Sequence, residues 1–142
     1  MLPLPHHYVV TAIPVVGEIH LISEGLSPLS TEAPVEFDGP GGLWSPETML
    51  VGAAADCFAI TFRGVARASH LEWLDMRCAA TGTLDRVDGV MRFTTIELHV
   101  HLTLAEGIDH GLAHRVLDKA KRSCLITNSM NAEVRLEATI AS

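Results

Sequence analysis

Residues 42–62 read GLWSPETMLVGAAADCFAITF, and their apolar residues have the spacing of a long helix. Ser45 offers a hydroxyl to cap this helix, Pro46 suits its first position, and Glu47 lies in its first turn, where the helix dipole favours an anion. We therefore expect a helix that starts at Ser45 and continues to about residue 68. The apolar face predicted from the spacing consists of Leu50, Ala53, Ala54, Cys57, Ile60 and Thr61, and continues towards Val65 and Ala68.

Three short strands are expected before this helix. Residues 8–13 and 18–23 are apolar runs separated by Pro14 and Gly17, which predicts a hairpin. In residues 31–37, TEAPVEF, apolar and polar side chains alternate, as they do in a half-buried strand. Because Pro34 has no N–H to donate, this third strand should lie at the edge of its sheet.

After the helix, the period of the apolar residues changes to two, which predicts strands at residues 72–85 and 94–104 with a turn at DRVDG between them. Asp109 can cap a second helix, and residues 133–140 alternate again as a last strand. The strand residues expected to point inwards are Leu74, Met76, Cys78, Ala80, Leu84, Thr94, Ile96, Leu98, Val100, Leu102, Leu104, Val134, Leu136, Ala138 and Ile140, and those of the second helix are Leu112, Ala113, Val116, Leu117 and Ala120. Cys78 is thereby assigned to the core.

The predicted order of elements is βββ-α-ββ-α-β. Clean alternation favours antiparallel sheets with one wet face, so we predict an α+β fold and a single domain over residues 1–142. The chain is 48% hydrophobic, which is enough to enclose a core at this length.

Charge and cysteine content argue against several classes of protein. The net charge is −7, which makes nucleic acid or an anionic membrane an improbable partner. Three cysteines without regular spacing do not form the disulfide framework of a secreted protein. The N-terminal MLPLPHHYVV lacks the regions of a signal peptide, and no apolar run approaches the roughly 20 residues that cross a bilayer. We expect a cytoplasmic protein.

Cys57 lies in the middle of the expected first helix, and Cys124 lies directly after the second one. Each can be a small buried side chain, which is the common role of a free cysteine. The position of Cys57, about three turns from the helix start, does not lower the pKa of its thiol, and a carboxylate of Asp56 close to the sulfur would raise that pKa. Lys121 and Arg122 can favour a thiolate at Cys124, although basic residues at a helix end commonly just complement the dipole.

The stretch SPETMLVGAAADCF, followed much later by AKRSCLITNSM, resembles the OsmC/Ohr family of thiol-dependent hydroperoxide reductases. The shared features are a Pro-Glu pair that ends ten residues before a helical cysteine, a second cysteine just after the second long helix, and the predicted order of elements. The resemblance implies an intertwined homodimer with two active sites at the subunit interface and no bound cofactor. It also implies that Cys57 is the peroxidatic cysteine, Cys124 the resolving cysteine and Glu47 an acidic helper.

The resemblance further implies an organic hydroperoxide as the substrate and a dithiol as the reductant. Cys57 would become a sulfenic acid, which would condense with Cys124 to a disulfide that the dithiol then reduces. An apolar pocket for the substrate would be built from residues such as Trp44, Leu50, Phe58 and Phe62.

The sequence departs from the Ohr pattern at one residue type. Ohr-type members have an arginine in the N-terminal strands that pairs with the glutamate, whereas the first lysine or arginine here is Arg63. This difference predicts an ordinary thiol pKa near 8.5 for Cys57 and a slow reaction. His20 is a candidate replacement for the arginine, and a solvated surface histidine is the alternative. The missing arginine also leaves open a second function, a dimeric binding or sensor protein of the same fold that holds an apolar ligand without turnover.

The position of Glu47 limits its role. Ten residues of helix span about 15 Å, so this carboxylate cannot contact the sulfur of Cys57 along one straight helix. Either the helix breaks between the two residues, or the partner subunit's Glu47 approaches the thiol. Interaction with the helix dipole alone is an equally good account of Glu47.

Two pairs of histidines have spacings that suit metal ligands, namely His99 with His101 and His110 with His114. No Cys-x-x-Cys or His-Glu-x-x-His signature accompanies them, and a solvated polar face explains both pairs. We therefore expect no native metal site.

Overall fold

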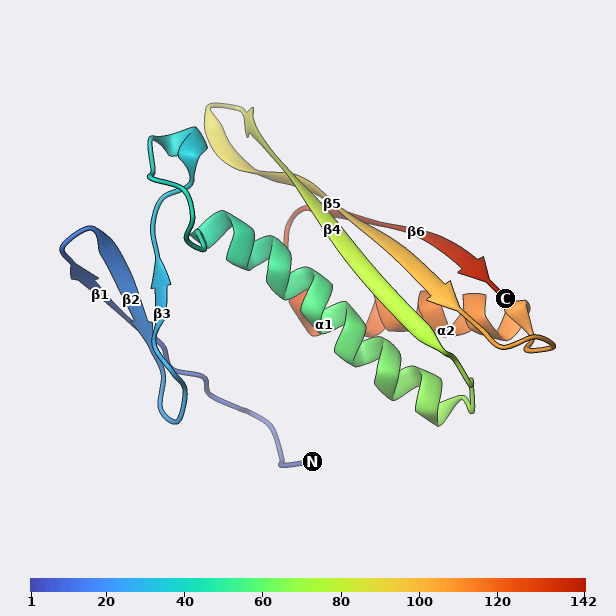
Figure 1. Cartoon of the computed structure of the whole chain (residues 1–142). Helices are drawn as coiled ribbons and strands as arrows, with labels where there is room; N and C mark the ends of the chain where they lie inside the picture. The colour runs from blue at the N-terminus through green and yellow to red at the C-terminus, as the bar shows by residue number, and fades with distance from the viewer. The chain divides into compact units, whose positions relative to one another are not determined.

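The computed structural model describes residues 1–142, and their contacts divide the chain into two compact units, residues 1–49 and 50–142 (Figure 1). The prediction of a single domain stays a prediction, and each unit is described by itself. In chain order the elements are β1 (Thr11–Val15), β2 (Glu18–Ile22), β3 (Leu29–Thr31), the 3-10 turn η1 (Val35–Phe37), α1 (Pro46–Ala68), β4 (Asp75–Val87), β5 (Val90–Thr103), α2 (His110–Ser123), α3 (Leu125–Asn128) and β6 (Glu133–Ala141).

The first unit contains an antiparallel sheet in the order β1-β2-β3. The predicted hairpin is confirmed, but its first strand lies a few residues later than residues 8–13 and includes Pro14, which is opposite Ile19. Because β1 is at the edge of this sheet, one side of the strand has no partner in the chain, and a proline is tolerated there. The turn contains Gly17, as the sequence predicts, and its φ of 83° favours glycine.

The predicted strand at residues 31–37 is wrong. The third strand, β3, ends at Thr31, and η1 follows it. The N–H of Phe37 donates to the carbonyl of Pro34 at 2.9 Å, so the backbone hydrogen bonds of this stretch are those of a tight turn. Alternation of apolar and polar residues does not distinguish such a turn from a strand, and Pro34 favours the turn.

The predicted start of the long helix is confirmed. The hydroxyl of Ser45 accepts a hydrogen bond from the N–H of Thr48 at 3.1 Å, and the hydroxyl of Thr48 accepts one from the N–H of Ser45 at 2.9 Å. This reciprocal pair satisfies two backbone donors at the start of α1 and has the form of a capping box, with threonine in place of glutamate.

The buried face of α1 differs from the predicted one. Its fully buried residues are Ala54, Phe58, Phe62 and Ala66, whereas Leu50 and Ile60 from the predicted face are 39% and 54% exposed. Because α1 is apolar on nearly all sides, helical spacing alone does not select the face that packs on the sheet. Phe58 and Phe62 are the largest fully buried side chains of the helix, and their burial determines which face of α1 packs on the sheet.

The expectation that no apolar run approaches the length that crosses a bilayer is wrong for α1, which by length and composition alone is long and apolar enough to do so. The central helix of a soluble protein has the same composition, and Phe58 and Phe62 are fully buried in the protein core. Only 22% of the most apolar window of α1 is buried, so core packing accounts for one side of the helix and leaves apolar residues exposed on the other.

The second unit contains a sheet in the order β4-β5-β6 (Figure 1). β4 and β5 form a long hairpin whose turn residues, Asp88 and Gly89, have φ values of 51° and 80°. Two consecutive positive φ values are typical of the tight turn that the Asp-Gly pair favours. The predicted inward residues of β5 are confirmed from Ile96 to Leu104, and Cys78 also packs against the core, while Leu74 and Leu84 are exposed.

The prediction of purely antiparallel sheets is wrong for the last strand, since β6 pairs with β5 in parallel. After β5 the chain passes through α2 and α3 and returns to the end of the sheet at which β5 began, as a parallel connection requires. Side-chain alternation is the same in both cases, so the sequence pattern did not distinguish them. α2 itself is confirmed, with Asp109 accepting a hydrogen bond from the N–H of Gly111 at 2.8 Å.

The core of the second unit lies between one face of the sheet and the helices. Buried side chains of α1, β5 and α2 form one cluster, and Figure 1 shows α1 and α2 on the same side of the sheet. The fold is therefore α+β, as predicted from the order of elements.

Candidate active site

Cys57 lies on α1, where its side chain is partly buried at the margin of the core. Its sulfur is 4.0 Å from the hydroxyl oxygen of Thr61, one helical turn later. It also lies within hydrogen-bonding reach of the Cys124 thiol and of the backbone at Leu125 and Ile126. Two cysteines that are far apart in the sequence therefore meet at one site, inside the second unit.

The environment of Cys57 favours its thiolate. Burial raises the pKa of the Cys57 thiol, but hydrogen bonds from the backbone at Ile126, from Cys124, from Thr61 and from the backbone at Leu125 together outweigh burial and lower it. The prediction of an ordinary thiol pKa is therefore wrong. A thiolate at this position is stabilised by neutral donors, and no arginine is needed for the shift.

Cys124 lies between α2 and α3 and is fully buried. Burial raises the pKa of its thiol, hydrogen bonds from the hydroxyl and backbone of Thr127 act against this, and the interaction with Cys57 raises the pKa further. Of the two alternatives for Lys121 and Arg122, a thiolate-favouring effect on Cys124 is not supported, since neither residue is among the groups that shift the pKa of this thiol. The interaction between the two cysteines thus lowers the pKa of the Cys57 thiol and raises that of the Cys124 thiol.

The two cysteines thus differ in chemical character. Both are free thiols. Cys57 is the more accessible and more acidic of the two, which suits a nucleophile, and Cys124 is a buried neutral thiol in contact with it. A nucleophilic thiolate with a second thiol beside it can be oxidised and then form a disulfide.

The short helix α3 is the element that the sequence analysis missed. Its first residues, Leu125 and Ile126, provide the backbone groups near the sulfur of Cys57. Cys124 occupies the N-cap position and makes no capping hydrogen bond through its side chain, so the usual serine, threonine or aspartate signal is absent. From the sequence, the pKa of Cys57 was judged by its distance from the start of α1, the helix that contains it. In the structure, the start of α3 lies near its sulfur and affects that pKa.

Cys78 has a structural environment. It lies on β4 opposite Val100, with its side chain against the core. Burial, followed by the electrostatic interaction with Cys124, raises the pKa of its thiol to about 11. Cys78 is therefore a neutral thiol at physiological pH, as expected of a core residue.

Glu47 lies in the first turn of α1, which is one unbroken helix from Pro46 to Ala68. A break between Glu47 and Cys57 is thereby excluded, so a catalytic role for Glu47 requires a carboxylate from a second subunit. One carboxylate oxygen of Glu47, Oε2, is buried without a hydrogen-bond partner. His20 does not serve as that partner, because its Nε2 contacts Oε1 of Glu18 at 3.0 Å.

The predicted apolar pocket is wrong in two of its four residues. Phe58 and Phe62 are completely buried in the core, and Phe62 packs edge-to-face against Trp73 with ring centroids 5.4 Å apart. They have no surface to offer a substrate. Leu50 and Trp44 are 39% and 53% exposed and remain available for apolar contacts.

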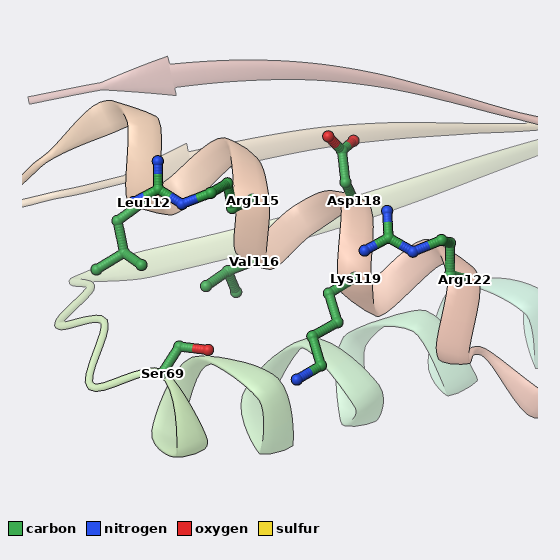
Figure 2. A pocket seen from close by; sticks show the side chains of 7 residues that line it. All are labelled: Ser69, Leu112, Arg115, Val116, Asp118, Lys119 and Arg122. Atoms are coloured by element: carbon green, nitrogen blue, oxygen red, sulfur yellow. The ribbon is translucent and has the colours of Figure 1, made fainter.

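Two grooves lie outside the cysteine pair, and the first is basic. It has a volume of about 290 Å³ and lies between α2 and the end of α1 (Figure 2). Its lining residues are Ser69, Leu112, Arg115, Val116, Asp118, Lys119 and Arg122.

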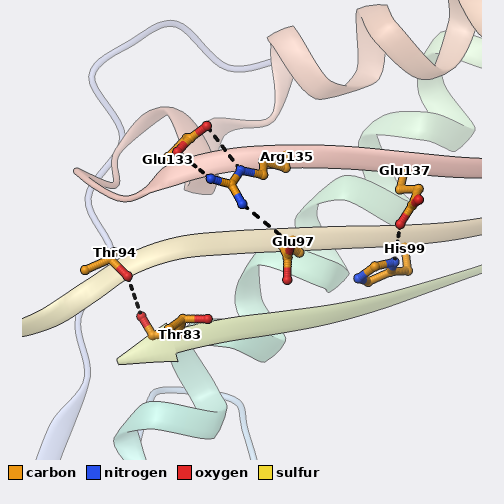
Figure 3. Close-up of polar contacts among 7 residues, drawn as sticks. All are labelled: Thr83, Thr94, Glu97, His99, Glu133, Arg135 and Glu137. Carbon is orange, nitrogen blue, oxygen red and sulfur yellow. Dashed lines mark hydrogen bonds and ion pairs between the residues drawn. The ribbon is translucent and has the colours of Figure 1, made fainter. Parts of the chain in front are cut away.

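The second groove, of about 310 Å³, lies on the polar face of the sheet (Figure 3). Arg135 pairs there with Glu133 and Glu97, and Nδ1 of His99 is 3.2 Å from Oε2 of Glu137. This face is the wet face predicted for β5, and His99 has a carboxylate partner on it. No three histidine, cysteine or carboxylate side chains come together as a set of metal ligands.

Residues 39–139 match the family model described as OsmC-like protein. The chain belongs to the OsmC-like protein family. It is 34% identical over 129 residues to the uncharacterized protein YmaD of Bacillus subtilis, covering 87% of this chain and 86% of that protein. It is 26% identical over 131 residues to the peroxiredoxin OsmC of Escherichia coli, covering 85% and 90%.

The fold agrees with this membership. The crystal structure of an OsmC-like protein from Mycoplasma pneumoniae aligns with a TM-score of 0.83 at 16% identity, covering 98% of this chain and 100% of that one. The OsmC-like family thus includes a peroxiredoxin, and the cysteine pair described above lies within the matched residues of this member.

Proposed function

We propose that this OsmC-like protein is a thiol-dependent peroxidase that reduces organic hydroperoxides through Cys57 and Cys124. The observation that supports the proposal is the difference between the two thiols. The more accessible thiol, Cys57, has a lowered pKa, and its buried neighbour, Cys124, has a raised pKa. A reaction that begins at one cysteine and is completed by the other requires this difference.

The reaction follows from the two roles. The Cys57 thiolate attacks an oxygen of the peroxide, the O–O bond breaks, and an alcohol leaves after protonation, with a sulfenic acid at Cys57. The Cys124 thiol then attacks that sulfur, releasing water and forming the Cys57–Cys124 disulfide. A dithiol reductant restores both thiols and is itself oxidised to a disulfide.

The proposal includes a homodimer. Within residues 50–142, α1 has a second apolar side, where Leu50 and Ile60 are exposed. In residues 1–49, Tyr8, Val9 and Val10 are exposed as well. Exposed apolar side chains along a long helix favour association with a second copy. A dimer can also supply the missing contacts of the Glu47 carboxylate.

A direct assay tests the proposal. The protein is incubated with a dithiol and either cumene hydroperoxide or hydrogen peroxide, and the loss of peroxide is followed. We expect turnover with a preference for cumene hydroperoxide, because the exposed apolar residues near α1 favour an organic group. Absence of turnover with both peroxides, in protein with three titratable thiols, would exclude the proposed activity.

A second candidate is a binding or sensor protein of the same fold. It is favoured by the absence of lysine and arginine before Arg63 and by the buried oxygen of Glu47 without a partner. Such a protein would hold an apolar ligand at the dimer interface and leave Cys57 unmodified by peroxide. The same assay separates the two candidates.

A further inference from the structure

Thr61 lies one helical turn after Cys57 on α1, and residues at this spacing share one side of a helix. Its hydroxyl oxygen is 4.0 Å from the sulfur of Cys57, and both side chains are partly buried. A serine or threonine hydroxyl in or beside a helix commonly donates to a carbonyl of the preceding turn, as Ser129 does to Leu125 at 2.9 Å. The hydroxyl of Thr61 has the sulfur as its partner instead.

The other groups around this sulfur belong to a different part of the chain. They are the thiol of Cys124 and the backbone at Leu125 and Ile126, which follow Cys124 directly in α3. Cys124 is also the one titratable neighbour, since no lysine, arginine, histidine or carboxylate is among the groups that shift the pKa of the Cys57 thiol. Among these partners, Thr61 alone belongs to α1.

This difference in position matters when the cysteine pair is oxidised. A disulfide holds its two sulfur atoms about 2 Å apart, so the two cysteines must move closer together and Cys124 must give up its proton. Any shift of Cys124 also shifts the adjoining residues Leu125 and Ile126. Cys57 and Thr61 lie in one continuous helix of 23 residues, so the spacing between them does not depend on that movement.

We propose that Thr61 is a positioning residue of the cysteine site, whose hydroxyl donates a hydrogen bond to the Cys57 thiolate and receives that thiolate again when the disulfide is reduced. This inference rests on the proposed function and adds a residue that holds its nucleophile. The hydroxyl keeps its proton throughout, because it is a far weaker acid than a thiol. Its role is to orient and stabilise the charged sulfur.

A donor to the thiolate stabilises the reduced protein and leaves the disulfide unaffected. A dithiol whose reduced form is stabilised has a disulfide that is easier to reduce. Loss of the Thr61 hydroxyl should therefore shift the equilibrium towards the Cys57–Cys124 disulfide. The shift requires an ionised Cys57, so it should be largest above the pKa of this thiol and should fall as the pH drops below that pKa.

The test compares Thr61→Val, which replaces the hydroxyl by a methyl group of similar size, with Thr61→Ser, which keeps the hydroxyl. Each protein is equilibrated with mixtures of reduced and oxidised dithiothreitol, quenched with acid, and analysed for the disulfide by mass spectrometry. At about pH 9, where the thiol is ionised, we expect the equilibrium constant of Thr61→Val to favour the disulfide about tenfold more than that of the unaltered protein. Thr61→Ser should lie close to the unaltered protein.

Alkylation by iodoacetamide gives an independent measurement on the reduced proteins. We expect the pH midpoint for Cys57 to rise by about one unit in Thr61→Val, and Thr61→Ser to restore most of that shift. Thr61→Ala removes the same hydroxyl with a smaller side chain and should behave as Thr61→Val does. Urea denaturation confirms that the variants compared are folded.

Two results would overturn the inference. One is an unchanged redox equilibrium together with an unchanged alkylation midpoint in folded Thr61→Val or Thr61→Ala. The other is an equal shift in Thr61→Ser and Thr61→Val, which would assign the effect to the packing of the threonine methyl group and not to its hydroxyl.

Neither measurement uses a peroxide, so the role of Thr61 is tested apart from the proposed function. Shifts in both measurements, in protein that does not consume cumene hydroperoxide, retain the role of Thr61 and reject the peroxidase. Turnover of cumene hydroperoxide, with a redox equilibrium and a midpoint that Thr61→Val leaves unchanged, retains the peroxidase and rejects the role of Thr61.

Discussion

The thiol of Cys57 on α1 lies against Cys124 and the first residues of α3, so the start of a four-residue helix provides the donors that favour its thiolate. These donors are neutral backbone and thiol groups. The N-terminal arginine that the resemblance to Ohr proteins led us to look for has no counterpart in this contact. The lowered pKa of Cys57 thus depends on how α2 ends and α3 begins.

The first prediction concerns the pH dependence of Cys57. Because the folded protein lowers the pKa of this thiol, we expect Cys57 to react with iodoacetamide at a pH below the ordinary thiol range near 8.5. The rate should rise through that lower pKa and then level off. Cys124→Ala removes one donor and should move the midpoint upwards. Mass spectrometry of the alkylated peptide across pH measures both midpoints, and identical midpoints would contradict the assigned role of the Cys124 thiol.

The second prediction distinguishes the two cysteines by the way each variant fails. Cys57→Ser should abolish peroxide consumption, because a serine hydroxyl is a weak nucleophile at neutral pH. Cys124→Ser should react once per subunit and then over-oxidise at Cys57 to sulfinic and sulfonic acids. A sulfenic-acid probe followed by mass spectrometry detects the first product. Equal behaviour of the two variants would show that the cysteines do not have separate roles.

The third prediction is that Cys78 contributes to stability and takes no part in the reaction. Cys78→Ser places a hydroxyl against the core and should lower the free energy of unfolding by about 1 kcal/mol. Urea denaturation measures this loss, and the peroxide assay should give the rate of the unaltered protein. A large loss of activity at full stability would place Cys78 in the mechanism.

The fourth prediction separates the two sides of α1. Phe58→Ala removes a fully buried side chain and should destabilise the fold by about 3–5 kcal/mol. Ile60→Asp alters an exposed residue and should leave the chain folded while weakening the proposed dimer. Sedimentation velocity at low micromolar concentration measures the dimer, with Ile60→Leu as the matched control. A stable, folded monomer of the unaltered chain at this concentration would exclude the dimer.

Local sequence signals predicted the parts of the fold that depend on neighbouring residues. Ser45 and Asp109 each marked a helix start through a side-chain oxygen, and the Asp88–Gly89 pair marked a two-residue turn. The inward residues of β5 followed from strict alternation. These features need no knowledge of distant contacts.

The errors arose where a local pattern fits two structures. Alternation in residues 31–37 also suits a turn at Pro34, and alternation in β6 is the same for parallel and antiparallel pairing. Because α1 is apolar on nearly all sides, its sequence does not determine which face is buried. In the structure that face contains Phe58 and Phe62. α3 has no capping side chain, so its contribution to Cys57 could not be read from spacing.

The most direct test of the central claim is mass spectrometry after one equivalent of cumene hydroperoxide, without a reductant. The proposed function predicts a loss of two hydrogens per chain and a disulfide-linked peptide that contains Cys57 and Cys124, with Cys78 remaining a free thiol. Unmodified Cys57 at every pH between about 6 and 9, in folded protein, would contradict a redox role for the pair.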